Sequence, residues 1–115
     1  MRDYLIVKNR NEFKRVTISE IASIEICSEK EHYVIVTKLN LEKIRGIGSL
    51  NKIEIQCSNS LVRCHRKTLI NINQIKKIDA AKRELTLSNG SQHTISRRRL
   101  KYLIVSWLDL ENTIV

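Results

Sequence analysis

The sequence has no proline, only three glycines and only five aromatic residues in 115 positions. Without proline, low-complexity tracts or self-similar periods, nothing in the chain marks a linker or a repeat. No stretch comes near the roughly 18 uncharged apolar residues of a membrane span, and the first residues lack the pattern of a signal peptide. These absences predict one domain over residues 1–115, located in the cytoplasm and without membrane contact.

Acidic residues are also scarce: there are 12 of them against 21 Lys and Arg, which gives a formal net charge of +9. Such an imbalance adds self-repulsion unless a polyanion is the partner, so nucleic acid is the leading candidate. A merely basic surface explains the charge equally well. The charge therefore indicates a class of partner and no mechanism.

Cysteine and histidine are too few and too scattered for a metal site. The three cysteines, Cys27, Cys57 and Cys64, form no CxxC pair and leave one over, which argues against a secreted disulfide framework. The neighbours Cys64 and His65 cannot alone supply the spaced ligands of a tetrahedral zinc site. We expect reduced thiols, no metal and no cofactor.

What the chain does contain is a series of short segments rich in Ile and Val, separated by polar residues. This pattern is typical of β-strands. It predicts a mainly β fold, with strands at residues 4–8, 13–18, 22–27, 32–37, 41–47, 75–79 and 84–88.

A β-hairpin is predicted around Asn89-Gly90. A two-residue turn would place polar residues opposite the apolar side chains of the preceding strand. A three-residue loop at 89–91 instead pairs Leu85 with Ile95, so that the apolar faces agree.

The C-terminal segment carries apolar residues at helical spacing, which predicts an amphipathic helix with Ser96 as its cap. Residues 49–55 also have helical character. The apolar stripe of the C-terminal helix consists of Leu100, Leu103, Ile104, Trp107 and Leu108.

Three cations, Arg97, Arg98 and Arg99, occupy the expected first turn of that helix, where the dipole and free N–H groups favour anions. A bound phosphate would be shared by the guanidinium and N–H groups. We interpret this cluster as a DNA contact rather than a solvated charge run.

Residues 63–68 form a second basic cluster. Strand alternation would place Arg63 and His65 on one face and Arg66 on the other. His65 and Asn71 are expected to hold the loop through hydrogen bonds to the backbone. Arg66 and Lys67 then remain free for phosphate.

Residues 28–33 form a polar turn between two predicted strands, whose tip can present His32 to a base edge. A histidine in a loop is usually only solvated, so this cluster is weak evidence by itself.

Residues 61–71, LVRCHRKTLIN, resemble the LytTR pattern of an apolar residue, Arg, any residue, His, a polar pair and then Asn. Residues 48–53 resemble the family's "GSL" helix start, and residues 73–78 its following strand. Asn89-Gly90 and residues 95–98 complete the order. The resemblance covers about residues 3–105. Two departures are Arg66-Lys67, where small or amide residues are more usual, and Leu61, where an aromatic residue is common.

The resemblance implies an elongated sandwich of small antiparallel β-sheets with short helices. It also implies sequence-specific binding of double-stranded promoter DNA by loops inserted into successive major grooves of bent DNA at direct repeats. His32 and Arg98 match base-contacting residues, while Arg63, His65 and Asn71 structure a loop. Contacts to the DNA backbone or within loops are expected from Lys30, Tyr33, Arg66, Lys67, Arg97, Arg99 and Lys101.

Family members are usually the output half of two-component response regulators, behind a receiver domain that is absent from these 115 residues. The resemblance thus implies a receiver, an upstream histidine kinase and a dimer on DNA repeats.

Three rival functions stay open. An RNA-binding module is permitted by the charge, but stacking aromatics are scarce. A nuclease would need carboxylates for a metal beside its histidines, and none cluster there, so we expect no enzyme. The third is a protein-interaction module.

Overall fold

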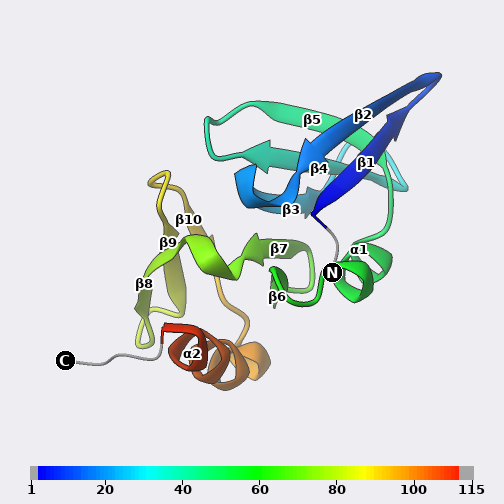
Figure 1. Cartoon of the computed structure of the whole chain (residues 1–115). Helices are drawn as coiled ribbons and strands as arrows, with labels where there is room; N and C mark the ends of the chain where they lie inside the picture. The colour runs from blue at the N-terminus through cyan, green and yellow to red at the C-terminus, as the bar shows by residue number, and fades with distance from the viewer. Residues whose placement is uncertain (1–2, 112–115) are drawn as a thin grey trace.

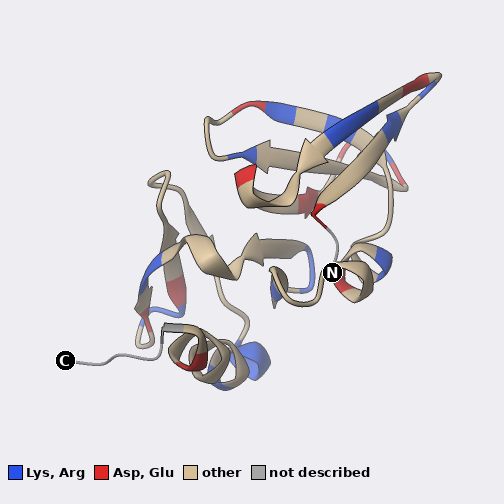
Figure 2. Cartoon of the chain, viewed as in Figure 1, with Lys and Arg blue, Asp and Glu red and all other residues tan. Residues whose placement is uncertain are grey.

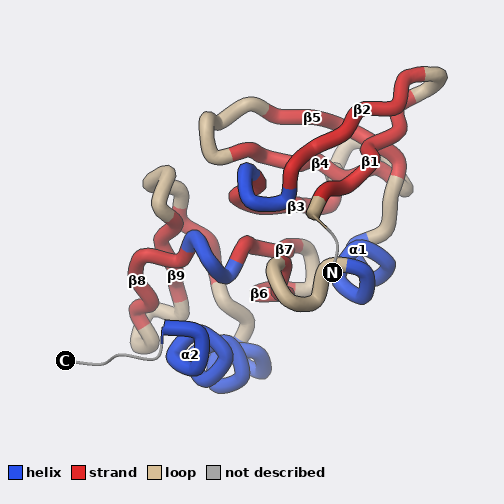
Figure 3. Tube along the Cα trace, viewed as in Figure 1, coloured by secondary structure: helices blue, strands red, loops and turns tan. Residues whose placement is uncertain are grey.

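In the computed structural model, which describes residues 3–111, the chain folds into two antiparallel sheets and two α-helices (Figures 1 and 3). The molecule is elongated, with extents of 49 × 27 × 24 Å. No helix within residues 3–111 is both long and apolar enough to cross a membrane.

The larger sheet has seven strands in the order β2-β1-β5-β4-β3-β7-β6, and the smaller has three in the order β10-β9-β8. All seven predicted strands are present within about two residues of their expected ends, five in the larger sheet and two in the smaller. The bounds are β1 Tyr4–Asn9, β2 Glu12–Thr17, β3 Ile21–Ile26, β4 Tyr33–Lys38, β5 Lys43–Ile47, α1 Leu50–Gln56, β6 Leu61–His65, β7 Thr68–Asn71, β8 Ile75–Asp79, β9 Glu84–Leu87, β10 Gln92–Thr94 and α2 Arg97–Glu111, with short 3-10 turns at Ile18–Glu20 and Ile72–Gln74.

The chain has two hydrophobic cores, and β3 contributes to both. In β1, Leu5 and Val7 point inward while the residues between them are exposed, as strand alternation requires. In β3 the first four residues are all buried, because Ile24 packs in the core beside α1 while Ala22 packs in the core beneath α2. A strand covered on both faces loses the alternation of a half-exposed strand.

Helix α2 packs on the second core through Leu103, with Leu100 and Trp107 against its rim. The predicted apolar stripe therefore faces this core, with Leu103 fully buried and Leu100, Ile104 and Trp107 half-buried, although Leu108 at its far end is exposed. The predicted side-chain cap is wrong: the hydroxyl of Ser96 is buried without a hydrogen-bond partner among the described residues. Its backbone N–H donates to the carbonyl of Cys64 at 2.9 Å, which fixes this residue against β6.

The β9–β10 hairpin has a three-residue loop, as predicted, but the loop spans 88–90 and Leu85 faces His93. The predicted pairing of Leu85 with Ile95 is therefore wrong by two residues along the strand. The last position of such a loop adopts a left-handed backbone, and Gly90 has φ of +87°. A shift of two residues keeps side chains on the same face, so Ile95 is still fully buried.

Candidate nucleic-acid interface

His32 lies at the end of the loop between β3 and β4, and its side chain is exposed. Its backbone φ is +63°, a left-handed conformation that is uncommon outside glycine. The carbonyl oxygen of His32 accepts a hydrogen bond from the N–H of Gly48 at 2.9 Å. This bond ties the loop to the segment before α1 and holds His32 on a defined backbone.

Lys30 and Tyr33 belong to the same loop region but border a different hollow. The ammonium group of Lys30 lies 4.3 Å from the centroid of the Tyr33 ring, an attractive cation–π contact. Both residues line an open pocket of about 820 Å³. His32 instead lines a pocket of about 300 Å³ together with Arg66, and Tyr33 borders both pockets. The structure thus brings His32 toward the second loop more directly than Lys30.

The second loop, between β6 and β7, exposes Arg66 and Lys67 and is held from beneath by Arg63. The Arg63 side chain is only 7% exposed. Its Nη1 donates to the carbonyl of Arg66 at 2.7 Å, and its Nη2 donates to Oδ1 of Asn51 at 2.6 Å. The carboxylate of Glu54 lies 3.1 Å from Nη2. A buried arginine thereby connects the loop to α1.

Strand alternation placed Arg63 with His65 and opposite Arg66, and this prediction is wrong. Arg63 and Arg66 line the same pocket, whereas His65 lines another one beside β10. The reason is a register shift in the β6–β7 ladder between Arg63 and His65, since an extra residue in one strand interrupts alternation.

His65 and Asn71 both bond to the backbone. Nδ1 of His65 accepts from the N–H of Lys67 at 3.3 Å. The buried amide of Asn71 donates to the carbonyls of Ile18 at 3.3 Å and Ile21 at 3.0 Å. The bonds of Asn71 satisfy polar groups that would otherwise be buried unpaired, and they fasten the end of β7 to the turn before β3.

The third cluster lies at the start of α2, where the ribbon in Figure 2 is blue for consecutive Lys and Arg residues. No acidic residue stands in the first turn of this helix. The backbone bond from Ser96 to Cys64 anchors the start of α2 to β6, the strand that leads into the second loop. The cluster comprises exposed Arg97, Arg98 and Lys101 and partly buried Arg99.

The sequence analysis missed two residues of this region, Asn51 and Glu54, which hold Arg63. One signal was available: residues three apart on a helix share a face, and residues 49–55 were predicted to be helical. Nothing in the spacing, however, indicates that this face meets Arg63.

Beside the second loop lies a group of neutral side chains. Burial raises the pKa of the Cys64 thiol to about 12, so it is not a reactive thiolate at neutral pH. Burial also lowers the pKa of His93. The carboxylate of Glu25 acts in the opposite direction, with its Oε1 3.8 Å from Nδ1 of His93. Because burial is the larger effect, His93 is neutral at pH 7 and this contact is not an ion pair there.

A family model described as the LytTr DNA-binding domain matches residues 11–106. No curated protein is similar enough in sequence to count as a match. Among solved structures, one similar to this chain is the LytTr DNA-binding domain of a Bacillus cereus protein described as a methyl-accepting/DNA response regulator. The two share 23% identity with a TM-score of 0.74, over 92% of this chain and 97% of that chain. At this identity the likeness shows a shared fold.

Proposed function

Because this chain belongs to the LytTR family of DNA-binding domains, we propose that it regulates transcription by reading promoter DNA through two loops and the first turn of α2, and not along the length of a recognition helix. Phosphate contacts would fix the register of the domain on the duplex, and a few side chains would specify sequence. The loops would enter successive major grooves of bent DNA at direct repeats.

The observation that carries this proposal is that all three clusters expose cations from fixed backbones. The carbonyls of His32 and Arg66 accept hydrogen bonds from Gly48 and Arg63. The start of α2 is bonded to β6. A backbone that is already held loses less conformational entropy on binding, so such segments are suited to recognition.

Arg98 is the proposed main base reader, because an arginine can bind O6 and N7 of guanine bidentately, worth about 1–3 kcal/mol against a wrong base. His32 would add a single base contact. The remaining cations would contact phosphates. Those proposed are Lys30, Arg66, Lys67, Arg97, Arg99 and Lys101, with Tyr33 in a supporting position.

The crowded cations at the start of α2 support a phosphate there. Each cation near a helix N-terminus costs about 0.3–1 kcal/mol against the dipole. A phosphate whose oxygens accept hydrogen bonds from the guanidinium and N–H groups would turn this electrostatic cost into a gain. If about five to seven phosphates are neutralised in all, the slope of log K against log salt is about −4.5 to −6.3.

We further propose that the domain acts as the output half of a two-component regulator, in which a histidine kinase phosphorylates a receiver domain and dimerisation follows. Two such domains on neighbouring repeats would gain affinity through effective concentration. The 115-residue chain alone should then bind each repeat weakly. Tight cooperative binding by this chain alone would contradict the arrangement.

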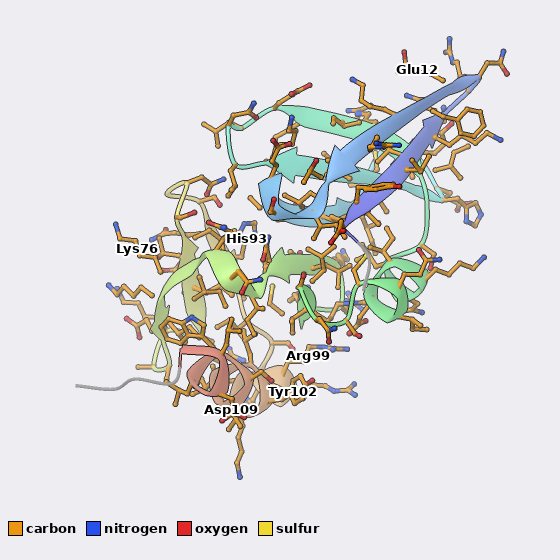
Figure 4. The ribbon with its side chains drawn as sticks, in the orientation of Figure 1. Glu12, Lys76, His93, Arg99, Tyr102 and Asp109 are labelled. Carbon is orange, nitrogen blue, oxygen red and sulfur yellow. The ribbon has the colours of Figure 1, made fainter. Side chains whose placement is uncertain are left out.

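The test is a fluorescence anisotropy titration of wild type, Arg98→Ala and Lys76→Ala. The probes are a duplex selected from a random library and its scrambled counterpart, each at two salt concentrations. Lys76 is the matched control, because it is an exposed cation on β8, away from Arg99 and the start of α2 (Figure 4).

We expect wild type and Lys76→Ala to prefer the selected duplex, and Arg98→Ala to lose that preference while keeping weak, salt-sensitive binding. Equal binding of every duplex by all three proteins would instead make the chain a non-specific basic module. A parallel arm with single-stranded RNA tests the alternative of an RNA-binding module, which tighter binding to that strand would favour.

A further inference from the structure

One short segment, Gly48 to Glu54, contacts both of the first two loops. At its start the N–H of Gly48 donates to the carbonyl of His32 at 2.9 Å. One turn further, Asn51 accepts from Arg63, which in turn donates to the carbonyl of Arg66. The loops that carry His32 and Arg66 therefore share a support in α1, in addition to the sheet, where the N–H of Ile26 donates to the carbonyl of Lys67 at 3.1 Å.

The position of Arg63 depends on α1. A buried guanidinium must be paired and hydrogen-bonded, since burial of an unpaired charge is costly. Its neutral acceptor is Asn51 at 2.6 Å and its charged partner is Glu54 at 3.1 Å. Nε of Arg63 has no partner among the described residues, so the two terminal nitrogens and these two acceptors set where the side chain lies.

A pocket of about 300 Å³ separates the two loops, and it is lined by His32 and Arg66 together with Asn51 and Arg63. Because the space between His32 and Arg66 is not filled by packed side chains, their separation depends on the bonds through α1 as well as on the pairing of β3 with β7. A small shift of Asn51 would pass through Arg63 to the backbone that carries Arg66.

We propose that Asn51 and Glu54 are positioning residues that fix the Arg66 loop relative to His32 and so set DNA affinity and sequence preference without contacting DNA. The inference rests on the proposed function of the loops. It adds that the first two loops read DNA as one unit supported by α1, whereas the Arg98 cluster at the start of α2 is held by a different bond, from Ser96 to Cys64 of β6.

Asn51→Ala is the central variant, because it removes an acceptor of Arg63 without changing any charge. We expect the preference for the selected duplex over the scrambled one to fall by about 5- to 150-fold, the range for one base contact, because the Arg66 loop is displaced relative to His32. The salt slope should become shallower by about 0.9, the value for one phosphate contact. Destabilised folding alone does not change that slope. The matched control is Gln56→Ala, which removes an exposed amide from the same helix.

Two further comparisons distinguish a positioning role of Asn51 from a direct contact between Asn51 and DNA. Asn51→Asp retains an acceptor for Arg63 and should restore the preference for the selected duplex over the scrambled one. In a protein that already carries Arg66→Ala, adding Asn51→Ala should change binding little further. With Arg98→Ala the two effects should add, because the start of α2 is held by the bond from Ser96 to Cys64 and not by Asn51. Thermal melting followed by circular dichroism confirms that each variant is folded at the assay temperature. Glu54→Gln tests the second positioning residue and remains usable if Asn51→Ala is unstable. Its charge-matched control is Asp109→Asn, at an exposed position of α2 (Figure 4).

Two outcomes overturn the inference while leaving the proposed function intact. The first is that the effects of Asn51→Ala and Arg66→Ala add, which would indicate that Asn51 contacts DNA directly. The second is that both Asn51→Ala and Glu54→Gln leave the preference for the selected duplex and the salt slope unchanged. If wild type itself does not discriminate between the duplexes, the proposed function fails first.

Discussion

Nη1 of Arg63 donates a 2.7 Å hydrogen bond to the backbone carbonyl of Arg66, so a buried guanidinium fixes the backbone of an exposed one. The same buried side chain is bound to Asn51 and Glu54 of α1. The loop proposed to meet DNA is therefore anchored in the folded core, and its geometry is linked to stability.

Replacing Arg63 with lysine should destabilise the domain. One ammonium group cannot reach Asn51 and the Arg66 carbonyl in the geometry of a guanidinium fork, and acceptors are left under-satisfied. We expect the free energy of unfolding, measured by urea denaturation, to fall by about 1–3 kcal/mol. The control Arg97→Lys, at an exposed position, should change it by less than about 0.5 kcal/mol. Equal effects of the two substitutions would show that the network around Arg63 adds no stability.

Lys67→Ala should weaken binding to the selected and the scrambled duplex by the same factor, because a phosphate contact carries no sequence information. The salt slope should become shallower by about 0.9. Lys76→Ala removes the same charge from β8 and should leave the slope unchanged. A loss of sequence preference in Lys67→Ala would show that this residue reads bases.

The lowered pKa of His93 predicts a loss of stability in acid. Burial holds the folded-state pKa below the ordinary value of 6.5, so above pH 6.5 both the folded and unfolded states carry neutral His93 and no penalty exists. As the pH falls below 6.5, the unfolded state binds the proton first and folding stability decreases until the folded pKa is passed.

The measurement is the difference in unfolding free energy between wild type and His93→Gln across pH 5–8. Below pH 6.5 the unfolding free energy of wild type should fall relative to that of the variant. Above pH 6.5 the two curves of unfolding free energy against pH should be parallel. Parallel curves throughout would mean that His93 ionises as readily in the folded state as in the unfolded one. Glu25 is the charged group opposing the shift, so Glu25→Gln should widen the difference.

Gly90→Ala should destabilise the β9–β10 hairpin by about 1–2 kcal/mol, the cost of a left-handed conformation for a residue with a Cβ. The space around Gly90 is open, so the penalty is conformational and not steric. Gly48→Ala is the control, since its Cβ would make ordinary contacts with Val34 and Ile53 at 3.5 and 3.6 Å. The measurement is the thermal unfolding midpoint of each variant, which should fall further for Gly90→Ala than for Gly48→Ala. Equal falls would contradict the role of the left-handed backbone at Gly90.

The family resemblance seen in residues 61–71 is confirmed by the match over residues 11–106, and the mainly β fold with a C-terminal amphipathic helix is also confirmed. Both depended on local patterns: alternation along single strands, helical spacing in residues 100–108 and one compact motif. The roles assigned to His32 and Arg98 stay predictions, because they depend on a DNA partner.

By itself the sequence determined the type of each long element, since apolar spacing is a property of neighbouring residues. Pairing was decided only in the folded chain: the left-handed backbone at Gly90 set the hairpin register, and the shift in the β6–β7 ladder brought Arg63 beside Arg66. Arg63 and Asn51 are 12 residues apart in sequence, and whether a buried cation finds that acceptor depends on how α1 packs against β6. No periodicity encodes such a contact, because it arises when separate elements are brought together by burial of their apolar faces.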